Sequence, residues 1–452
     1  MTNLVTTSVV RTKPLMTMQQ ILVMNLGFFG IQYSFGMQQT AVNPVYEFLG
    51  ANPHDLPILN LAGPITGLLI QPLIGALSDR TWSPRWGRRK PFFLIGAIGC
   101  SLCLFFFPFV TAVWMAVMLL WLLDASNNTA MEPYRAFIGD KLPPSQLGKG
   151  FLAQAFFTGL GITLANVSLF VFQQFIDGAT SAGIPYWVVG SFMLGAVCSI
   201  GSVLISVLRT PEIPPTPEEL AAIRANKGGL GSAITEIGHA IRDMPVQLRK
   251  LAAVYFFQWY GMAVYWQFIA LMVAQTLFPA TDQGKEEAVA WTGLVNGWYN
   301  IVTFSVAFAL VAFARKRGAK LVHCVCLLLA ALGLMIVPSI GNQYLIFIPM
   351  IGLGIAWASI MGVPYIMAVR MIPSTRLGVY MGIINMMIVI PMLIESLTFG
   401  WIYETLLGGN PSNAIRFAAV FLAIGGLLML WIKEPRAVRD VDDVTAMPVG
   451  GH

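Results

Sequence analysis

Asp124 is the residue whose position points most clearly to chemistry, because it lies near the middle of the apolar stretch 114–138. An isolated charge at the centre of a bilayer costs at least ~2.5 to 3.5 kcal/mol on insertion scales, so an acid there needs a reason. A carboxyl that is shielded from water is suited to binding and releasing a proton. We predict that Asp124 carries a proton. An aspartate held permanently by neighbouring polar side chains is the alternative.

Further polar side chains follow Asp124 along one face of the same stretch. At 100° per residue, Asn128, Glu132 and Arg135 fall within roughly 80° of Asp124 on a helix. We expect Asp124 and Asn128 to contact a polar solute. Glu132 and Arg135 lie nearer the end of the stretch, where we predict a gating or structural role. They would pair with each other or with the loop around Asp79.

The stretch 251–277 combines aromatic and amide side chains, as a sugar site requires. Amides pair with sugar hydroxyls by hydrogen bonds, and flat aromatic faces cover the apolar C–H patches of the ring. For a sugar solute, Gln258, Trp259 and Trp266 are the candidate contacts, and the alternative is that the tryptophans lie at a membrane interface or in helix packing. Other amides in apolar stretches are candidate sugar ligands or helix-packing residues: Gln39, Asn43, Gln71, Asn296, Asn300 and Asn385.

Glu395 is a second acid deep in an apolar stretch. It is a candidate for a second proton site, and interhelical hydrogen bonding or packing is the alternative. The four histidines, His54, His239, His323 and His452, fall in loops, at helix ends or at the terminus, so no metal cluster and no His-paired nucleophile is readable. The sequence therefore predicts no enzyme, and no cofactor apart from a proton as the coupling ion.

These residues must be positioned by helices that cross a membrane. Of the 452 residues, 56% are hydrophobic and only 11% are charged, which excludes an ordinary soluble protein. The apolar runs have the ~20-residue length of a helix that spans a bilayer, and they lack the alternation of a β-barrel. Twelve runs are predicted, at 19–42, 57–78, 92–111, 114–138, 150–176, 186–208, 251–277, 290–314, 321–339, 343–368, 378–404 and 412–432.

Positive charge sets the predicted orientation of these runs. With the N-terminus in the cytoplasm, each of the 27 Lys and Arg residues except Lys285 and Arg416 falls in a cytoplasmic loop or at the cytoplasmic end of a helix. We therefore predict an all-α membrane protein with both termini cytoplasmic. Insertion polarity accounts for the net charge of +6, so no nucleic-acid partner is expected. The expected partners are the lipid bilayer and a small solute, and the expected state is a monomer.

The longest polar stretch separates two sets of six spans. The predicted units are an N-terminal bundle at 1–208, a cytoplasmic linker with short helices at 209–250, a C-terminal bundle at 251–432 and a cytoplasmic tail at 433–452. A local pattern recurs in both bundles: Pro133-Tyr134-Arg135, Pro144-Ser145 and Leu147-Gly148 in the first, and Pro364-Tyr365, Pro373-Ser374 and Leu377-Gly378 in the second. Such repetition is expected in transporters that rock two pseudo-symmetric bundles around a central site.

The loop after the second span reads Gly75-Ala-Leu-Ser-Asp79-Arg80, then Arg85-Trp86-Gly87-Arg88-Arg89-Lys90-Pro91-Phe92. It resembles the loop motif of the major facilitator superfamily. More narrowly, it resembles the sucrose-transporter-like branch of the glycoside-pentoside-hexuronide:cation symporters. Further matches are Gly63-Pro64 with Gln71-Pro72, the run Leu123 to Thr129, and Gly382 to Asn385 followed by Ile390-Pro391. The sequence departs from the plant members at Met392, where they carry glutamine.

This resemblance implies the major facilitator fold, with two pseudo-symmetric six-helix bundles. It also implies proton-coupled import of sucrose, maltose or related glucosides by alternating access. Asp79, Arg80, Arg88 and Arg89 are implied to form a gate at the inner mouth, with Asp79 as the acceptor of charge pairs that part when the bundles rock. Their plainer role is to orient the loop toward the cytoplasm. The short loops resemble those of bacterial members, which implies the bacterial inner membrane.

Two alternatives to proton-coupled sugar import stay open. Sodium coupling would need several oxygen ligands and commonly more than one carboxylate, whereas Asp124 is the one mid-membrane acid of the first half. A facilitator for another small polar solute or a drug is the second alternative. A wide apolar cavity would indicate a drug exporter. A peptide carrier would need a deep Arg or Lys that binds the substrate carboxylate.

Overall fold

The computed structural model describes residues 13–79, 81–218, 220–221, 241–371 and 377–433. Within these ranges it is helical, with two isolated β-bridges and no strand. The long helices are α1 (Met18–Thr40), α4 (Ala62–Asp79), α5 (Lys90–Phe106), α6 (Val113–Lys141), α7 (Pro144–Gln173), α8 (Tyr186–Arg209), α11 (Val246–Leu277), α12 (Asp282–Arg317), α13 (Ala319–Ile336), α14 (Phe347–Met371), α15 (Leu377–Thr405) and α16 (Pro411–Leu428). Short helices connect or extend them: α2 (Val42–Phe48), η1 (Pro53–Asp55), α3 (Leu56–Leu59), η2 (Phe107–Phe109), η3 (Val337–Ser339) and η5 (Met429–Trp431).

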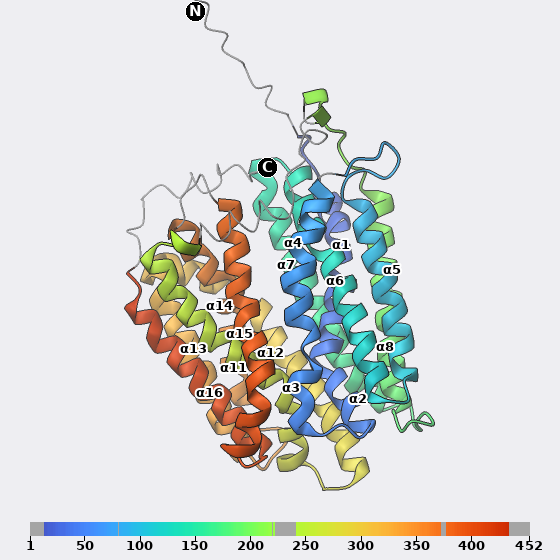
Figure 1. Cartoon of the computed structure of the whole chain (residues 1–452), viewed down its shortest axis with the longest axis vertical. Coiled ribbons are helices and arrows are strands. Elements are labelled where there is room, and N and C mark those ends of the chain that lie inside the picture. The colour runs from blue at the N-terminus through green and yellow to red at the C-terminus, as the bar shows by residue number, and fades with distance from the viewer. Residues whose placement is uncertain (1–12, 80, 219, 222–240, 372–376, 434–452) are drawn as a thin grey trace, which may run out of the picture.

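The helices pack into two groups, which Figure 1 shows side by side. The first group holds α1 to α8, and the second holds α11 to α16. One cluster of buried apolar residues lies wholly in the second group, from Leu248 to Ile432. The other two clusters lie in the first group, except that one of them also includes Val289 and Ala290 of α12 and has Leu271 of α11 packed against it. Contact between the groups is made mainly by α12 against α7, and by α15 against α4, η1 and α3.

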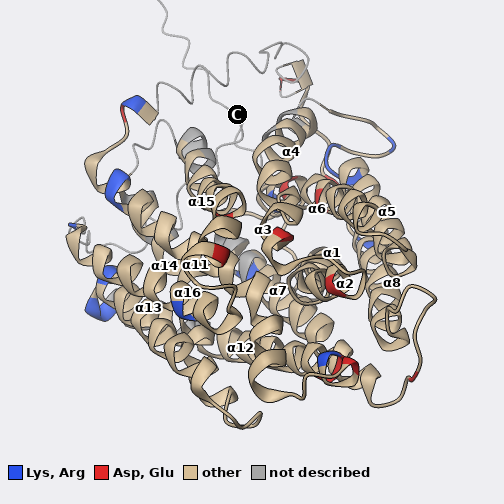
Figure 2. Ribbon diagram, turned by 60° about the horizontal axis from the view of Figure 1, so that its bottom comes forward, with Lys and Arg blue, Asp and Glu red and all other residues tan. Residues whose placement is uncertain are grey.

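Helices long and apolar enough to cross a membrane run through both groups. By length and composition, eight of the described helices meet this standard, and they include α4, α5, α7 and α8 in the first group and α13 to α16 in the second. Charged residues lie mostly at helix ends and in loops (Figure 2). This pattern makes the chain an integral, multi-pass membrane protein.

The remaining long helices, α1, α6, α11 and α12, are not among these eight, and together they carry more than half of the predicted site residues. Each of the twelve predicted apolar runs overlaps one long helix, but several helices extend beyond their runs. For example, α12 begins at Asp282, where the Thr281 hydroxyl accepts a hydrogen bond from the Gly284 N–H. A polar first turn with this cap continues the helix past the apolar run, and an apolar pattern does not reveal it.

The repeated pattern and the starts of several helices can be located in the structure. The proline of the repeated pattern lies inside a helix in both groups, as Pro133 in α6 and Pro364 in α14. The start of α1 contacts the start of α7 through Met16 N–H and Gln146 Oε1, at 2.9 Å. In the second group, Lys250 at the start of α11 donates to the Trp431 carbonyl at 3.1 Å. Residues 219 and 222–240 of the predicted linker and 434–452 of the predicted tail lie outside the described residues.

Candidate substrate and proton site

Asp124 lies in the middle of α6 with only 4% of its surface exposed. Gln38 of α1 and Tyr46 of α2 lie beside its carboxyl. Gly63 of α4 is so near that a Cβ added there would lie 3.3 Å from Asp124 Oδ2. Among the residues that the structure describes, no cation forms an ion pair with this carboxyl. Asp124 is therefore enclosed by neutral groups.

A row of amides connects Asp124 with the second group of helices. Asn128 Nδ2 donates to the Asp124 backbone carbonyl at 2.9 Å and to Thr66 Oγ1 at 3.1 Å. Gln71 Nε2 of α4 donates to Asn128 Oδ1 at 2.7 Å. Asn385 Nδ2 of α15 donates to Gln71 Oε1 at 3.0 Å. We call Asn128, Gln71 and Asn385 the amide row. It brings predicted site residues from α6, α4 and α15 together and crosses between the groups.

Glu395 of α15 is fully buried, and its contacts differ from those of Asp124. Its Oε2 accepts hydrogen bonds from Gln267 Nε2 of α11 at 3.1 Å and from Ser396 Oγ at 3.4 Å. Its Oε1 is buried with no hydrogen-bond partner. Tyr260 of α11 lies close by. All of these neighbours belong to the second group, and the bond to Gln267 is the interhelical role that the sequence left open.

Three tryptophans form an aromatic cluster in the second group. The Trp259 and Trp266 rings of α11 lie 6.4 Å apart, and Trp357 of α14 packs nearly at right angles to both, at 5.8 and 5.3 Å. Trp259 is 5% exposed, whereas Trp266 is only partly buried and donates from Nε1 to Tyr299 Oη at 3.4 Å. Trp266 is therefore the predicted tryptophan with more surface to offer a sugar ring. The sequence did not reveal Trp357, because one isolated tryptophan in an apolar run carries no spacing signal.

The amides predicted on α12 are buried and have partners within the protein. Asn296 Nδ2 donates to Thr40 Oγ1 of α1 at 3.0 Å, and Asn296 Oδ1 accepts from Tyr265 Oη of α11 at 2.7 Å. Asn300 Nδ2 donates back to the Asn296 carbonyl at 2.9 Å. Asn296 thus bridges the two groups of helices but lies outside the amide row.

The remaining predicted amides of the first group lie near the end of α1. Asn43 is buried, and its Oδ1 accepts from Asn60 Nδ2 at 2.6 Å. Gln39 is partly exposed and follows Gln38, the neighbour of the Asp124 carboxyl. Neither residue takes part in the described hydrogen bonds of the amide row.

Gln258 is enclosed within the second group and has no exposed surface. Its Oε1 lies 2.9 Å from His323 Nε2, and His323 Nδ1 lies 2.8 Å from Ser359 Oγ. The structure does not bring Gln258 together with Asp124. The sequence placed His323 at a helix end and missed this contact, because residues of α11, α13 and α14 meet only in three dimensions.

The positively charged loop is held by acids that the sequence did not single out. Glu212, which follows α8, accepts from the backbone N–H groups of Arg88 and Arg89 at 2.8 Å each, and from that of Lys90 at 2.9 Å. Arg89 Nε donates to Asp140 Oδ2 of α6 at 2.9 Å. These contacts tie the loop to the ends of α6 and α8. The role of Arg88 and Arg89 in gating stays a prediction.

Glu132 and Arg135 pair with each other at 3.0 Å, which is one of the two pairings considered for them. The Asp79 side chain, predicted as the acceptor of the gate, and the whole of Arg80 lie outside what the structure describes. The gate at the inner mouth therefore stays a prediction as well.

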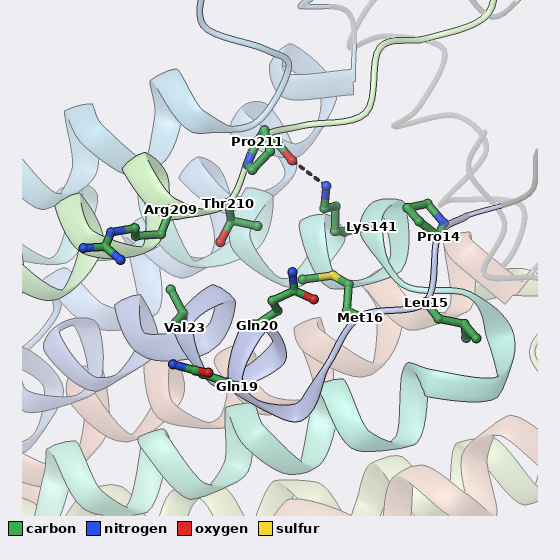
Figure 3. A pocket seen from close by; sticks show the side chains of 10 residues that line it. All are labelled: Pro14, Leu15, Met16, Gln19, Gln20, Val23, Lys141, Arg209, Thr210 and Pro211. Carbon is green, nitrogen blue, oxygen red and sulfur yellow. Dashed lines mark hydrogen bonds between the residues drawn. The ribbon is translucent and has the colours of Figure 1, made fainter.

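A cavity of about 330 Å³ lies at the end of the first group where α1 begins (Figure 3). Lys141 and Arg209 are among its lining residues, and Lys141 Nζ donates to the Pro211 carbonyl at 2.6 Å. No residue of the amide row lines this cavity. Within the described part of the chain, no three His, Cys, Asp or Glu side chains are grouped so that they could hold a metal ion.

Comparisons with known sequences match the chain to transport proteins. The family model of the Major Facilitator Superfamily matches residues 24–395. Sucrose transport protein SUT5 of Oryza sativa subsp. indica is 23% identical over 487 residues, covering 94% of this chain and 88% of that protein. Sucrose transport protein SUC4 of Arabidopsis thaliana is 24% identical over 454 residues, covering 89% and 87%.

Solved structures share the fold. The nucleoside transporter NupG aligns with a TM-score of 0.68 at 11% identity, over 92% of this chain and 98% of that one. A D-xylose-proton symporter aligns with a TM-score of 0.65 at 15% identity, over 91% and 97%.

Proposed function

Since this chain belongs to the Major Facilitator Superfamily and is a transporter, not an enzyme, we propose that it imports a glucoside or disaccharide of the sucrose or maltose class together with a proton. The similarity to sucrose transport proteins over about nine-tenths of the chain supports the solute class. The observation that carries the proton is Asp124, a buried carboxyl among neutral neighbours at one end of the amide row.

In this proposal Asp124 binds the proton and, together with the amide row, the sugar. Amides suit sugar hydroxyls because each offers both a donor and an acceptor. Within the amide row, the bond between Gln71 and Asn385 joins the two groups, so a sugar that replaces this bond would contact both groups. Trp266 supplies an aromatic face from α11. Coupling arises when protonation of Asp124 and binding of the sugar favour the same movement of the groups.

We also propose that the chain crosses the bilayer twelve times, with both termini in the cytoplasm of a bacterial cell, and that it works as a monomer in the inner membrane. The overlap of every predicted run with a long helix and the asymmetry of Lys and Arg support this topology. The N-terminal bundle would be 1–208 and the C-terminal bundle 251–432, joined by a cytoplasmic linker. Alternating access then means rocking of one group of helices against the other.

Uptake into liposomes tests this function. The protein is reconstituted, and labelled sucrose and maltose are followed with and without an inward proton gradient. We expect accumulation of at least one sugar that depends on the gradient and disappears when a protonophore is added. Accumulation that follows a sodium gradient instead would replace the proton by sodium. No uptake of either sugar would require another solute class, such as a different small polar solute or a drug.

A further inference from the structure

Two glycines lie at contacts between the two groups of helices. A Cβ added at Gly293 of α12 would lie 2.5 Å from the Asn166 carbonyl oxygen of α7. On α15, a Cβ at Gly400 would lie 2.8 Å from the His54 carbonyl oxygen of η1. Real Cβ atoms essentially never come closer than 3.0 Å to a heavy atom from another part of the chain. A backbone carbonyl cannot turn aside as a side chain can. Any larger residue at Gly293 or Gly400 therefore forces the groups apart.

A hydrogen-bonded network crosses between the groups beside the first of these glycines. Thr40 of α1 donates to Asn166 Oδ1 of α7 and accepts from Asn296 Nδ2 of α12 at 3.0 Å. Tyr265 of α11 joins through Asn296 Oδ1. Thr40, Asn166 and Asn296 are each at most 2% exposed. Polar groups this deeply buried are stable only while they have partners, so the network favours the closed contact.

Both contacts lie in the half of the molecule nearer one end. Thr40 is the last residue of α1, and Asn296 lies 14 residues after the start of α12 at Asp282, or roughly 21 Å along that helix. At the rim of the same end, His54 Nδ1 lies 4.0 Å from Glu404 Oε1. This end is opposite to the one where α1 begins. In the proposed topology it faces the outside of the cell.

We propose that Gly293, Gly400, Thr40, Asn166 and Asn296 form an outer gate. The glycines allow the two groups to close on the outer side, and the three polar residues hold them closed. Asn296, predicted from the sequence as a sugar ligand, is then a positioning residue that sets the balance between outward-open and outward-closed molecules. This inference rests on the proposed topology, but not on the identity of the solute or of the coupling ion.

Distances between spin labels test the gate without any substrate. Labels are placed at Asp177, beyond the end of α7, and at Leu406, beyond the end of α15, because both residues are exposed and lie outside the gate. Cys198, the one cysteine that is not buried, is first replaced by serine. In Gly293→Ala we expect the ratio of long to short distances to rise about tenfold, because the closed contact no longer fits. Gly201→Ala in α8 is the matched control, since a Cβ there meets nothing within 4 Å, and it should leave the ratio unchanged.

Two further variants keep the test decisive if Gly293→Ala does not fold. Gly400→Ala should shift the ratio in the same direction through the other contact. Asn296→Ala, which removes bonds without adding volume, should shift it about threefold. Distances that match the wild type in the variants that fold would overturn the gate. So would a shift of equal size in Gly201→Ala. Because no sugar is present, failure of the gate and failure of the proposed function are separate results.

Discussion

Asp124 and Glu395 are both buried carboxyls in long helices, but their contacts are organised differently. Asp124 lies at one end of a row of amides that reaches from α6 through α4 to α15, and so from one group of helices to the other. Glu395 contacts Gln267 and Ser396, which belong to its own group. The Asp124 carboxyl itself lies among residues of its own group, but the row that ends at its backbone carbonyl crosses between the groups and must rearrange when they move. The described partners of Glu395 move with it. A coupling residue needs the first arrangement, because only partners that change can alter its affinity for a proton.

The largest effect is expected from Asp124→Asn. Each proton that enters down 100 mV supplies ~2.3 kcal/mol, enough for ~50-fold accumulation of a neutral sugar. The asparagine variant keeps the shape of the site but cannot carry the proton, so accumulation should fall to the level without a gradient. Exchange of labelled for unlabelled sugar should continue. Uptake and counterflow in liposomes measure the two activities, and a variant that still accumulates sugar would remove Asp124 from the coupling.

Breaking the amide row should have the next largest effect. Gln71→Ala and Asn385→Ala each remove the bond by which the row crosses between the groups, and we expect each to lower kcat/KM about tenfold. If the row works as one unit, the double variant should be little worse than either single variant. Asn60→Ala, which removes an amide contact inside the first group, is the control and should change kcat/KM much less. Strictly additive losses would contradict a connected row.

Glu395→Gln should have a small effect on transport. A glutamine has the same shape and still offers an oxygen to Gln267 Nε2. Gradient-driven accumulation should stay within about threefold of the wild type, since the contacts that change during transport are elsewhere. Uptake under the same gradient as for Asp124→Asn measures this directly. Loss of accumulation with retained exchange would reverse the comparison and make Glu395 a coupling residue.

A third acid, Glu47 of α2, shows how burial can outweigh a nearby cation in setting the pKa of a carboxyl. Burial raises its pKa from 4.5 to about 8, and Lys285 opposes that rise only in part. A raised pKa in the folded state means that Glu47 costs stability once it ionises, so its contribution worsens as the pH rises from 4.5 through about 8. Glu47→Gln should therefore match the wild type at pH 5 and melt ~3 °C higher at pH 8.5.

Thermal unfolding in detergent at the two pH values provides the measurement for Glu47→Gln. Other titrating groups are common to both proteins and cancel in the difference. If the variant melts below the wild type at pH 8.5, Glu47 is stabilised as an ion by Lys285, and burial is not the dominant effect.

The sequence predicted the helices and the position of Asp124 inside one of them because both signals are local. An apolar run of about 20 residues indicates a span by itself, and one acid inside it stands out without any knowledge of its neighbours. The contact between Asn128 and Asp124 also follows from the helix period. Gln71 and Asn385 were candidates individually, but their contact joins residues 314 positions apart and needed the structure.

The contacts that the sequence missed share a physical cause. Glu212 caps the loop at Arg88 from a polar linker, where one acid among many gives no signal. His323 pairs with Gln258 across helices that no spacing rule connects. Asn296 was a candidate sugar ligand because it is an amide in an apolar stretch, and the sequence could not show that Thr40 and Tyr265 are its partners in this structure. The sequence shows which polar side chains lie in apolar stretches, but only the folded structure shows their hydrogen-bond partners.

Sugar-driven proton movement tests the central claim most directly. A pH-sensitive dye is enclosed in liposomes that contain the wild type, Asp124→Asn or Glu395→Gln, and sucrose or maltose is added outside with no imposed gradient. The account predicts acidification of the interior by the wild type and by Glu395→Gln, and none by Asp124→Asn. Acidification that persists in Asp124→Asn, or that is lost only in Glu395→Gln, would contradict it.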